Sequence, residues 1–453
     1  MAKKILTVIS ALLIAIFALC ACGYNPKPIA HEDYSKEDVI GNGGLAVKQG
    51  NYLYFVNGVT DYTGSNKIGT VVKGAIMRYT LDETGSVTGE PVTIVPKKVY
   101  SSYAGAGIYV FGDWIYYVTP SEVTSAGGKE LTDYIEFMRT KVDGTGTQTI
   151  KRIEGNSTQY AFVNGSLIYN SNNKLTSINC ETHKETVISE NVSSFTIPKT
   201  AYKANSTATD PDNLVYYIES KPEDDKSSRT YNSLCVATAD GATKVTVISA
   251  DTYQEEGKYD YTKCYTLSIS GYTNGTLYFT KSYTANSSTT AAGTFAYNFK
   301  DYVNADAKYE ATRETEIVAT NFSMVYPIDA NTYLLADSSN MWTYATDSAT
   351  YTKLNGDDSF SVTALNKVED GYVYYTGNSQ KLYRYKLDGT QVVEPLVREN
   401  FDTSFMYPTL VAGSVYYIKN DDYKYCYVLK VGEKESKMIG VMSEADASAS
   451  AEA

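Results

Sequence analysis

The sequence predicts an all-β protein built as a single β-propeller of about eight four-stranded antiparallel blades. A tyrosine-rich strand motif recurs eight times at a mean spacing of about 52 residues, within the range of propeller repeats. The motif does not alternate between apolar and polar residues, as YVYY at 372–375 shows, which indicates a strand covered on both faces. Helical periodicity is absent throughout, which favours an all-β chain.

The motif is expected to form the second strand of each blade. Its copies lie at 52–56, 114–118, 167–169, 214–218, 277–279, 333–335, 372–375 and 415–418. Turn pairs such as Asn164-Gly165 and Asp370-Gly371 precede most copies and connect them to a short first strand, as at 159–163. In a propeller each sheet packs between two neighbours and ring closure protects the strand edges, so a doubly apolar second strand is expected.

A third strand and a more polar fourth strand complete each predicted blade. The third strands are expected at 75–81, 135–142, 174–178, 234–238, 294–299, 341–345, 381–387 and 425–431. Tight turns such as Asp143-Gly144 and Asp388-Gly389 end several of them, and a fourth strand follows, as at 244–249. Seven blades is the alternative if the weak sixth unit, 322–354, or the first unit does not form a blade. An open β-solenoid is the second architecture considered, although its strands would repeat at shorter steps.

Residues 1–21 are predicted to be a signal peptide, because Lys3 and Lys4 precede an apolar run that is short for a membrane span. The run ends in Leu19-Cys20-Ala21-Cys22-Gly23, which resembles the lipobox of bacterial lipoproteins. The resemblance implies cleavage before Cys22 and attachment of lipid to its sulfur, with acyl chains such as palmitate sufficient for stable anchoring. An ordinary cleaved signal or an uncleaved anchor is the alternative. The expected location is the extracytoplasmic face of a bacterial cell membrane.

The rest of the chain divides into three predicted parts. Residues 22–43 are expected to hold the lipidated cysteine and a flexible spacer, and 44–441 the propeller. The low-complexity acidic tail 442–453 is expected to be disordered. A net charge of −12 without a basic patch argues against a nucleic-acid partner.

The blade pattern also resembles a known family. The pattern Ile-Tyr-Tyr, then Leu-Tyr-Arg and Asp-Gly, resembles an uncharacterised bacterial family of propeller domains; its best copies are 113–118 with 137–139 and 143–144, and 371–375 with 382–384 and 388–389. That family is itself similar to the YWTD propellers of low-density-lipoprotein receptors. The Tyr-Trp-Thr-Asp motif is absent from every unit here, so the resemblance implies a surface-anchored binding scaffold and neither receptor-like ligand binding nor catalytic residues.

Residue types that carry chemistry are scarce. The two histidines, His31 and His183, have no companion at the spacing of a zinc site or a Ser-His-Asp triad. Acidic pairs are explained by turn chemistry; they lie at Asp224-Asp225, Asp357-Asp358 and Asp421-Asp422. We expect no metal, no cofactor and no catalysis. A glycosidase or lyase with a site at the channel mouth is the alternative, and a purely structural role in an envelope assembly is a third.

Long links point to one face of the ring. Links between second and third strands, and links between blades, emerge on the same face; the long ones are 57–73, 119–133, 219–230, 281–293 and 250–263. Only one long insertion, 199–213, belongs to the opposite face. Because function is often carried by loops on a rigid scaffold, we expect a peptide, glycan or protein ligand on the first face. The predicted contact residues are Tyr62, Tyr253, Tyr259, Tyr261 and Tyr283.

Two further expectations concern side chains in this picture. The five tyrosines should be mostly exposed if they bind a ligand, whereas rings that merely hold the loops would pack onto the blade rims. The remaining cysteines, Cys180, Cys235, Cys264 and Cys426, are expected to be free and mostly buried, since their predicted strands lie too far apart for disulfides.

Overall fold

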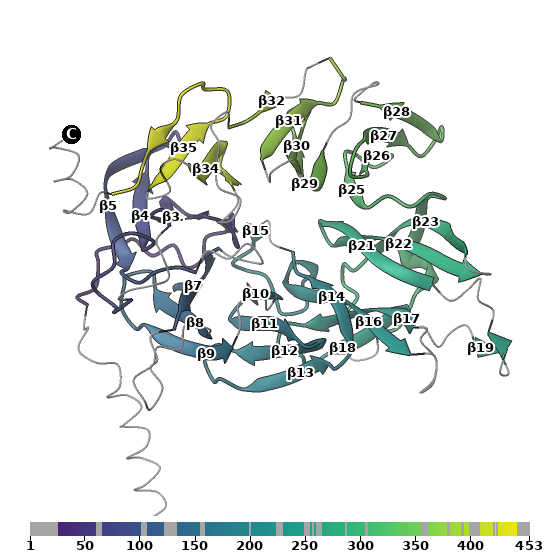
Figure 1. Cartoon of the computed structure of the whole chain (residues 1–453), viewed down its shortest axis with the longest axis horizontal. Helices are drawn as coiled ribbons and strands as arrows, with labels where there is room; N and C mark the ends of the chain where they lie inside the picture. Colours follow the sequence, from purple (N-terminus) through teal and green to yellow (C-terminus); the bar gives the residue numbers. More distant parts are fainter. Residues whose placement is uncertain are drawn as a thin grey trace, which may run out of the picture.

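Eight four-stranded antiparallel sheets follow one another around a central channel in the part of the chain that the structure describes (Figure 1). The computed structural model describes residues 26–59, 66–100, 107–121, 134–154, 159–198, 201–222, 230–248, 254–255, 258–259, 265–285, 288–303, 307–354, 361–377, 381–390, 394–397, 408–419, 422 and 425–441. The four strands of each blade follow one another in sequence order, which confirms the eight-bladed propeller, including the weak sixth unit.

The strands of the first four blades run in order from the channel outward. Blade 1 contains β2 (Ala46–Gln49), β3 (Tyr52–Val56), β4 (Ile76–Leu81) and β5 (Val87–Val95); blade 2 contains β6 (Tyr109–Phe111), β7 (Trp114–Pro120), β8 (Tyr134–Lys141) and β9 (Gln148–Glu154); blade 3 contains β10 (Gln159–Val163), β11 (Ser166–Ser171), β12 (Lys174–Asn179) and β13 (Glu185–Ser189); blade 4 contains β14 (Val192–Thr196), β16 (Leu214–Pro222), β17 (Thr230–Thr238) and β18 (Lys244–Ile248).

The last four blades repeat this arrangement. Blade 5 contains β21 (Tyr265–Thr273), β22 (Thr276–Ala285), β23 (Ser288–Asn298) and β24 (Glu314–Val318); blade 6 contains β25 (Met324–Pro327), β26 (Thr332–Ala336), β27 (Met341–Ala345) and β28 (Thr350–Lys353); blade 7 contains β29 (Val362–Glu369), β30 (Tyr372–Gly377), β31 (Leu382–Lys386) and β32 (Glu394–Pro395); blade 8 contains β33 (Thr409–Val411), β34 (Ser414–Ile418), β35 (Cys426–Lys430) and β36 (Lys437–Met438). A small hairpin of β19 (Gln254–Glu255) and β20 (Lys258–Tyr259) lies between blades 4 and 5, and two short 3-10 helices are η1 (Pro211–Asn213) and η4 (Ala311–Arg313).

The second strands are buried on both faces, as the missing alternation predicts. Every residue of β3 and β34 is buried, and Tyr54, Tyr216 and Tyr417 are among the most deeply buried large side chains. The hairpins that enter these strands turn through left-handed residues, with φ 37° at Asn164 and 81° at Gly165. Two consecutive positive φ values are the requirement of a type I′ turn, and Asn-Gly meets it at low cost.

The ring closes without exchange of a strand between its ends. Blade 1 is built only from 46–95 and blade 8 only from 409–438. The backbone N–H of Leu45 donates to Thr409 Oγ1 at 2.8 Å. The side chain of Asn57 donates to the carbonyl of Val441 at 3.1 Å and accepts from its N–H at 3.0 Å. At the seam, where blades 1 and 8 meet, hydrogen bonds between side chains and backbone therefore take the place of a shared sheet.

Two short strands extend blade 1 into the channel. β1 (Val39–Ile40) pairs with β2, and β15 (Ala201–Tyr202), from the insertion in blade 4, pairs with β1. Figure 1 shows β15 close to the centre of the ring. β1 and β15 therefore lie between the first strand of blade 1 and the centre of the ring (Figure 1), although the sequence predicts both segments outside the blades.

Residues 26–45, here named the strap, lie against the ring. The N–H of Ile29 donates to the carbonyl of Asp143 at 2.9 Å, and Arg78 donates to the carbonyl of Ala30 at 2.8 Å. The ring of Tyr34 packs edge-on against Tyr52 at 4.9 Å between centroids. From residue 26 onward the segment differs from the flexible spacer expected for 22–43, because its backbone is paired with two blades.

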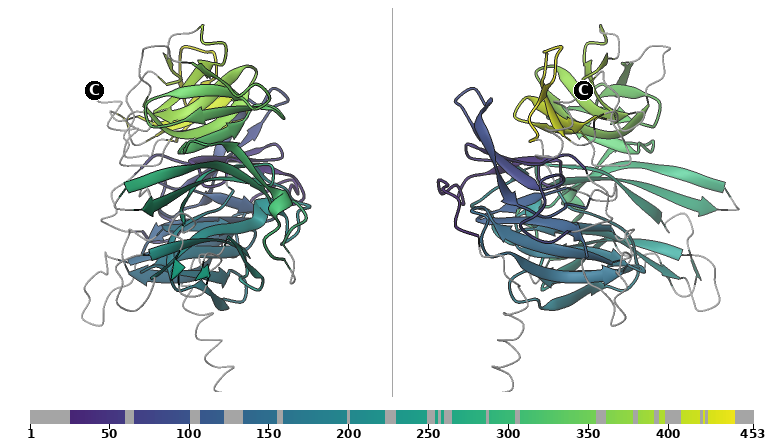
Figure 2. Two further views of the ribbon diagram at one scale, coloured as in Figure 1. Left: turned by 90° about the vertical axis from the view of Figure 1, so that its right-hand side faces the viewer. Right: turned by 60° about the vertical axis from the view of Figure 1, so that its left-hand side comes forward.

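The links expected at 219–230 and 281–293 are largely strand. β16 and β17 pair as far as Pro222 and Thr230, and β22 and β23 pair as far as Ala285 and Ser288. These two long hairpins, here named the arms, extend the sheets of blades 4 and 5, and Figure 2 shows long strands projecting beyond the ring. We name the face on which the second-to-third links emerge the arm face, and the opposite face the strap face.

Candidate functional site

The five predicted ligand-contact tyrosines are only partly placed by the structure. Tyr62, Tyr253 and Tyr261 lie outside the described residues. Tyr259 ends β20, where its backbone pairs with Gln254. Tyr283 lies on the arm of blade 5, opposite Tyr265 and Thr290, and its side chain is half-buried. The expectation that most of these rings are exposed on one face stays a prediction.

The tip of the blade 5 arm is polar and exposed. Ser288, Thr289, Thr290 and Ala291 are all exposed on β23, and β24 pairs only with the lower part of this strand, from Thr294 to Tyr297. Small side chains on a protruding antiparallel hairpin leave the backbone and hydroxyl groups accessible to a partner. The tip of the arm is therefore an exposed, extended hairpin, whereas the sequence predicts a link between strands at 281–293.

A buried ion pair lies at the base of this arm. Lys281 Nζ is 2.5 Å from Glu314 Oε1, and the two side chains are 9% and 13% exposed. The ammonium also lies 4.1 Å from the centroid of the Phe295 ring. Among the described residues, no group hydrogen-bonds to the buried Oε2 atom of Glu314. The pair joins β22 to β24 across β23, so it holds the arm to the outer edge of its blade.

The described part of the first long link is packed against the neighbouring blade. Asn66 is buried, and its amide donates to Thr119 Oγ1 and to the carbonyl of Pro120, both at 2.9 Å. Its Oδ1 accepts from the N–H of Lys98 at 2.8 Å. On the arm face, this link is therefore bonded to blade 2, while the arms project.

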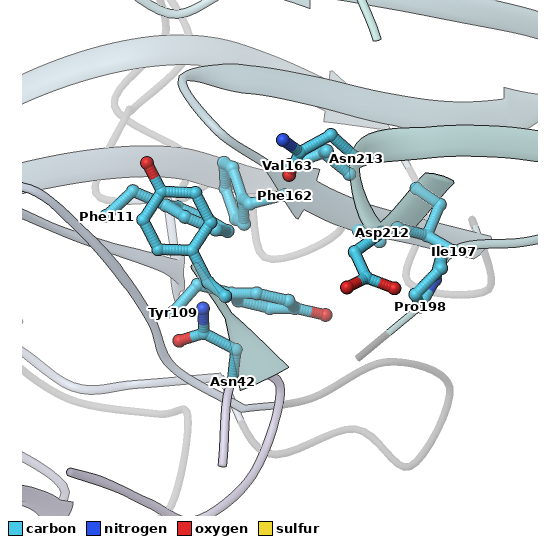
Figure 3. Close-up of a pocket in the computed structure, with 11 residues that line it drawn as sticks. Asn42, Tyr109, Phe111, Phe162, Val163, Ile197, Pro198, Asp212 and Asn213 are labelled. Carbon is cyan, nitrogen blue, oxygen red and sulfur yellow. The ribbon is translucent and has the colours of Figure 1, made fainter. Parts of the chain in front are cut away.

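A small pocket lies between the strap and the first strands of blades 2 and 3 (Figure 3). Tyr109, Phe111 and Phe162 line one side, and Asp212 and Asn213 of the blade 4 insertion line the other (Figure 3), while the Tyr202 ring packs edge-on against Phe111 at 4.9 Å between centroids. Tyr109 is 2% exposed, and no described group hydrogen-bonds to its hydroxyl, which burial also keeps protonated by raising its pKa. The free volume is about 20 Å³, room for one water molecule and too small for a sugar or a peptide side chain.

Two of the polar side chains that line the pocket, those of Asn42 and Asp212, make hydrogen bonds within the protein. The Asn42 side chain accepts from the N–H of Val110 at 2.8 Å and donates to its carbonyl at 3.1 Å. Asp212 accepts from the Tyr272 hydroxyl at 2.6 Å. Because these residues are far apart in sequence and carry no motif, the sequence offered no signal for the pocket.

Groups that could bind a metal or act as nucleophiles are dispersed. No group of three or more His, Cys, Asp or Glu side chains is arranged to hold a metal ion among the described residues. His31 is exposed in the strap, and His183 is exposed in a left-handed turn with φ 59°. The acidic pairs predicted at turns fall outside the described residues except for Asp422, which accepts a hydrogen bond from the Tyr427 hydroxyl.

The cysteines that the structure describes are free and buried. They are Cys180, Cys235 and Cys426, as predicted, while Cys22 and Cys264 lie outside the described residues. Burial raises the pKa of Cys180 to about 12, so its thiol is protonated and unreactive at neutral pH. No helix in the described part of the chain is long and apolar enough to cross a membrane.

No protein-family model matches the chain, and neither does any curated protein. Solved structures do match. The tricorn protease shares 10% identity at a TM-score of 0.43 over 83% of this chain, which spans only 35% of that protease. The β-propeller domain of the Trilobed protease from Pyrococcus furiosus shares 11% sequence identity at a TM-score of 0.39, and the match covers 75% of this chain and 96% of that domain. AztD from Citrobacter koseri shares 11% sequence identity at a TM-score of 0.40, and the match covers 88% of this chain and 96% of AztD.

These similarities are distant. The three structures named above are two proteases and AztD, and the resemblance to the YWTD propellers of low-density-lipoprotein receptors stays a prediction. At such identities and TM-scores they carry no argument about activity. What the chain has in common with them is the propeller, which its own strand order establishes.

Proposed function

We propose that this protein is a lipid-anchored lipoprotein on the extracytoplasmic face of a bacterial membrane, whose propeller is a non-catalytic scaffold that binds a protein, peptide or glycan on its arm face. The observation that carries the binding role is the pair of arms that extend from one face of the ring. The arms of blades 4 and 5 extend from one face, and the exposed tip of β23 carries small polar side chains. The pocket beside the channel has room for one water only.

The arm is tested by shortening it without disturbing the ring. Tyr283 and Thr290 face each other across the hairpin, so replacing residues 284–289 with Asn-Gly closes the arm with a two-residue turn. We expect the chain from Gly23 onward to bind a peptide or glycan on an array, and the shortened variant to lose that binding while its melting temperature is unchanged. The matched control is Asp347→Ala, an exposed turn residue of blade 6 on the strap face, which should bind normally. Equal binding by the shortened variant would contradict the proposal.

The same array separates binding from the enzymatic alternative. A glycosidase or lyase at the channel mouth would cleave a glycan and release a new reducing end or an unsaturated product. Asp212 is the one carboxylate that lines the described pocket. Product formation that Asp212→Asn abolishes would favour the enzyme over the scaffold.

Anchoring is tested at Cys22. We expect Cys22→Ser to move the protein from the membrane fraction to the soluble fraction, because the thiol that would carry the acyl chains is absent. Cys20→Ser is the matched control and should remain in the membrane fraction. Mass spectrometry of the mature N-terminus should show a lipidated cysteine, and an unmodified residue would contradict the anchoring.

A further inference from the structure

We infer that the strap sets the orientation of the propeller on the membrane, so that the strap face near blade 2 lies next to the bilayer and the arm face points away from it. This inference rests on the proposed lipid anchor at Cys22. It concerns a lipid surface as the partner of one face of the ring, and three sets of contacts and one length carry it.

The outer end of the strap is held at the rim of blade 2. Ile29 donates its N–H to the carbonyl of Asp143, in the turn between β8 and β9. A Cβ on the next residue, Gly144, would lie 3.3 Å from the Ile29 side chain, which shows how closely the strap lies against this turn. The turn itself belongs to the strap face, because the N–H of Val142 donates to Asp113 in the turn between β6 and β7.

The middle of the strap is fitted to blade 1. The N–H of Glu32 donates to the Tyr52 hydroxyl at 2.6 Å. Arg78, which donates to the carbonyl of Ala30, is itself buried and lies 4.1 Å from the centre of the Tyr52 ring. The ring of Tyr34 covers Gly50, where any Cβ would come within 2.4 Å of that ring. A glycine with φ 53° at this turn thus leaves the space that the strap occupies.

The inner end of the strap enters the channel. Asp38 forms an exposed ion pair with Lys203 at 2.8 Å, and Val39 and Ile40 pair on one side with β2 and on the other with β15. The chain then continues into the first strand of blade 1. The strap is therefore bonded along its length, from the rim of blade 2 to the centre of the ring.

The free length between lipid and strap decides the orientation. Three residues lie between Cys22 and Pro26, and the four fully extended Cα–Cα steps span at most about 14 Å. The two faces of the ring are separated by the length of its strands, and the seven residues of β7 span about 20 Å at about 3.3 Å per residue. The tether is thus shorter than the distance between the two faces, so an anchor that leaves the strap face cannot reach a bilayer lying against the arm face. A free spacer through residue 43 would reach about 70 Å and would leave every orientation open.

The inference is tested by energy transfer on the lipidated full-length chain in vesicles that contain an acceptor-labelled lipid. A donor dye is attached to a single introduced cysteine, either Glu83→Cys in a strap-face turn of blade 1 or Ser288→Cys at the tip of the arm; both positions are exposed. The chain without an introduced cysteine gives the background from native thiols. We expect greater transfer from position 83 than from position 288.

A variant with a longer tether provides the control. About 20 Gly and Ser residues inserted after Gly23 add roughly 25 Å of flexible reach and leave the strap and the ring unchanged. We expect the difference between the two dye positions to be lost in this variant. Equal transfer from the two positions in the natural chain, or greater transfer from position 288, would overturn the orientation and leave the proposed function standing. A mature chain without lipid at Cys22 would overturn the anchoring and the orientation together.

Discussion

At the scale of single residues, one buried polar contact connects strands of the blade 5 arm. The Lys281–Glu314 pair joins two strands of blade 5 that are not neighbours, and Phe295 lies beneath the ammonium. Taking both charges out of water is costly, and their attraction repays that cost only while both partners are present. The pair therefore acts as a geometric constraint on the arm more than as a source of net stability.

This leads to a prediction for two variants of the pair. Lys281→Ala should lower the free energy of unfolding by about 3–5 kcal/mol, because it leaves Glu314 buried without its partner. The double variant Lys281→Met, Glu314→Leu should recover most of that loss, because it removes both charges and keeps apolar volume. Denaturant unfolding of both variants measures the difference. A double variant as unstable as the single one would contradict this explanation, because it would show that the intact pair itself stabilises the fold.

At the scale of elements, several of the turns between third and fourth strands share one arrangement. In each of two such turns, an aspartate accepts hydrogen bonds from the backbone N–H and the hydroxyl of the threonine two residues later; these are Asp82 with Thr84 and Asp388 with Thr390. The bonds hold the turn in shape and satisfy the carboxylates, which explains acidic residues at these positions without any metal.

The same hydrogen bonds predict how these turns respond to acid. The threonine hydroxyl and backbone N–H lower the pKa of Asp388 below its ordinary value. Because the pKa is lower in the folded state, the stabilisation is present above the unfolded pKa of about 3.9 and is lost as the pH falls through the folded value. Asp388→Asn should therefore lose less stability than the natural chain between about pH 5 and about pH 3. Urea midpoints at the two pH values test this, with Asp347→Asn, an exposed aspartate of the blade 6 turn, as the control.

At the scale of the whole molecule, the ring depends on a seam without a shared sheet. Asn57 is fully buried there, and its side chain makes hydrogen bonds to the carbonyls of Val72 and Val441 and accepts from the N–H of Val441. The strap adds contacts on the other side of the same blade. Blade 1 is thus hydrogen-bonded to Val441 at one face and to the strap at the other.

We predict that Asn57→Ala loosens the seam. Removing the amide leaves buried backbone groups without partners, at about 1–3 kcal/mol for each group. Hydrogen exchange should accelerate in 409–441 and in β2 more than in blades 3 to 6. The control is Asn170→Ala, which removes an amide that bonds to the Val192 carbonyl within the ring, and there the change should stay in blades 3 and 4. Uniform acceleration in both variants would show that the seam is no weaker than any other blade contact.

Local sequence patterns predict about eight blades, with seven as the alternative, and the positions of their second and third strands. A second strand covered on both faces must be apolar without alternation, and a two-residue hairpin needs residues that accept positive φ, so both features are visible locally. The three described cysteines follow from the same strand assignment.

Only the tertiary structure decided how the strap, the channel and the arms are arranged. Val39 pairs with Tyr202, and Leu45 bonds to Thr409 across 364 positions, and no local pattern encodes such partners. The tip of the blade 5 arm, 288–291, is a run of small residues that are all exposed. It therefore lacks the alternation that identifies a strand, and the sequence predicts a link there. A buried strand can be recognised in the sequence from its pattern of apolar residues, whereas an exposed strand or a long-range contact leaves no such pattern. The arms and the strap, on which the proposed binding and orientation depend, are exposed strands and long-range contacts.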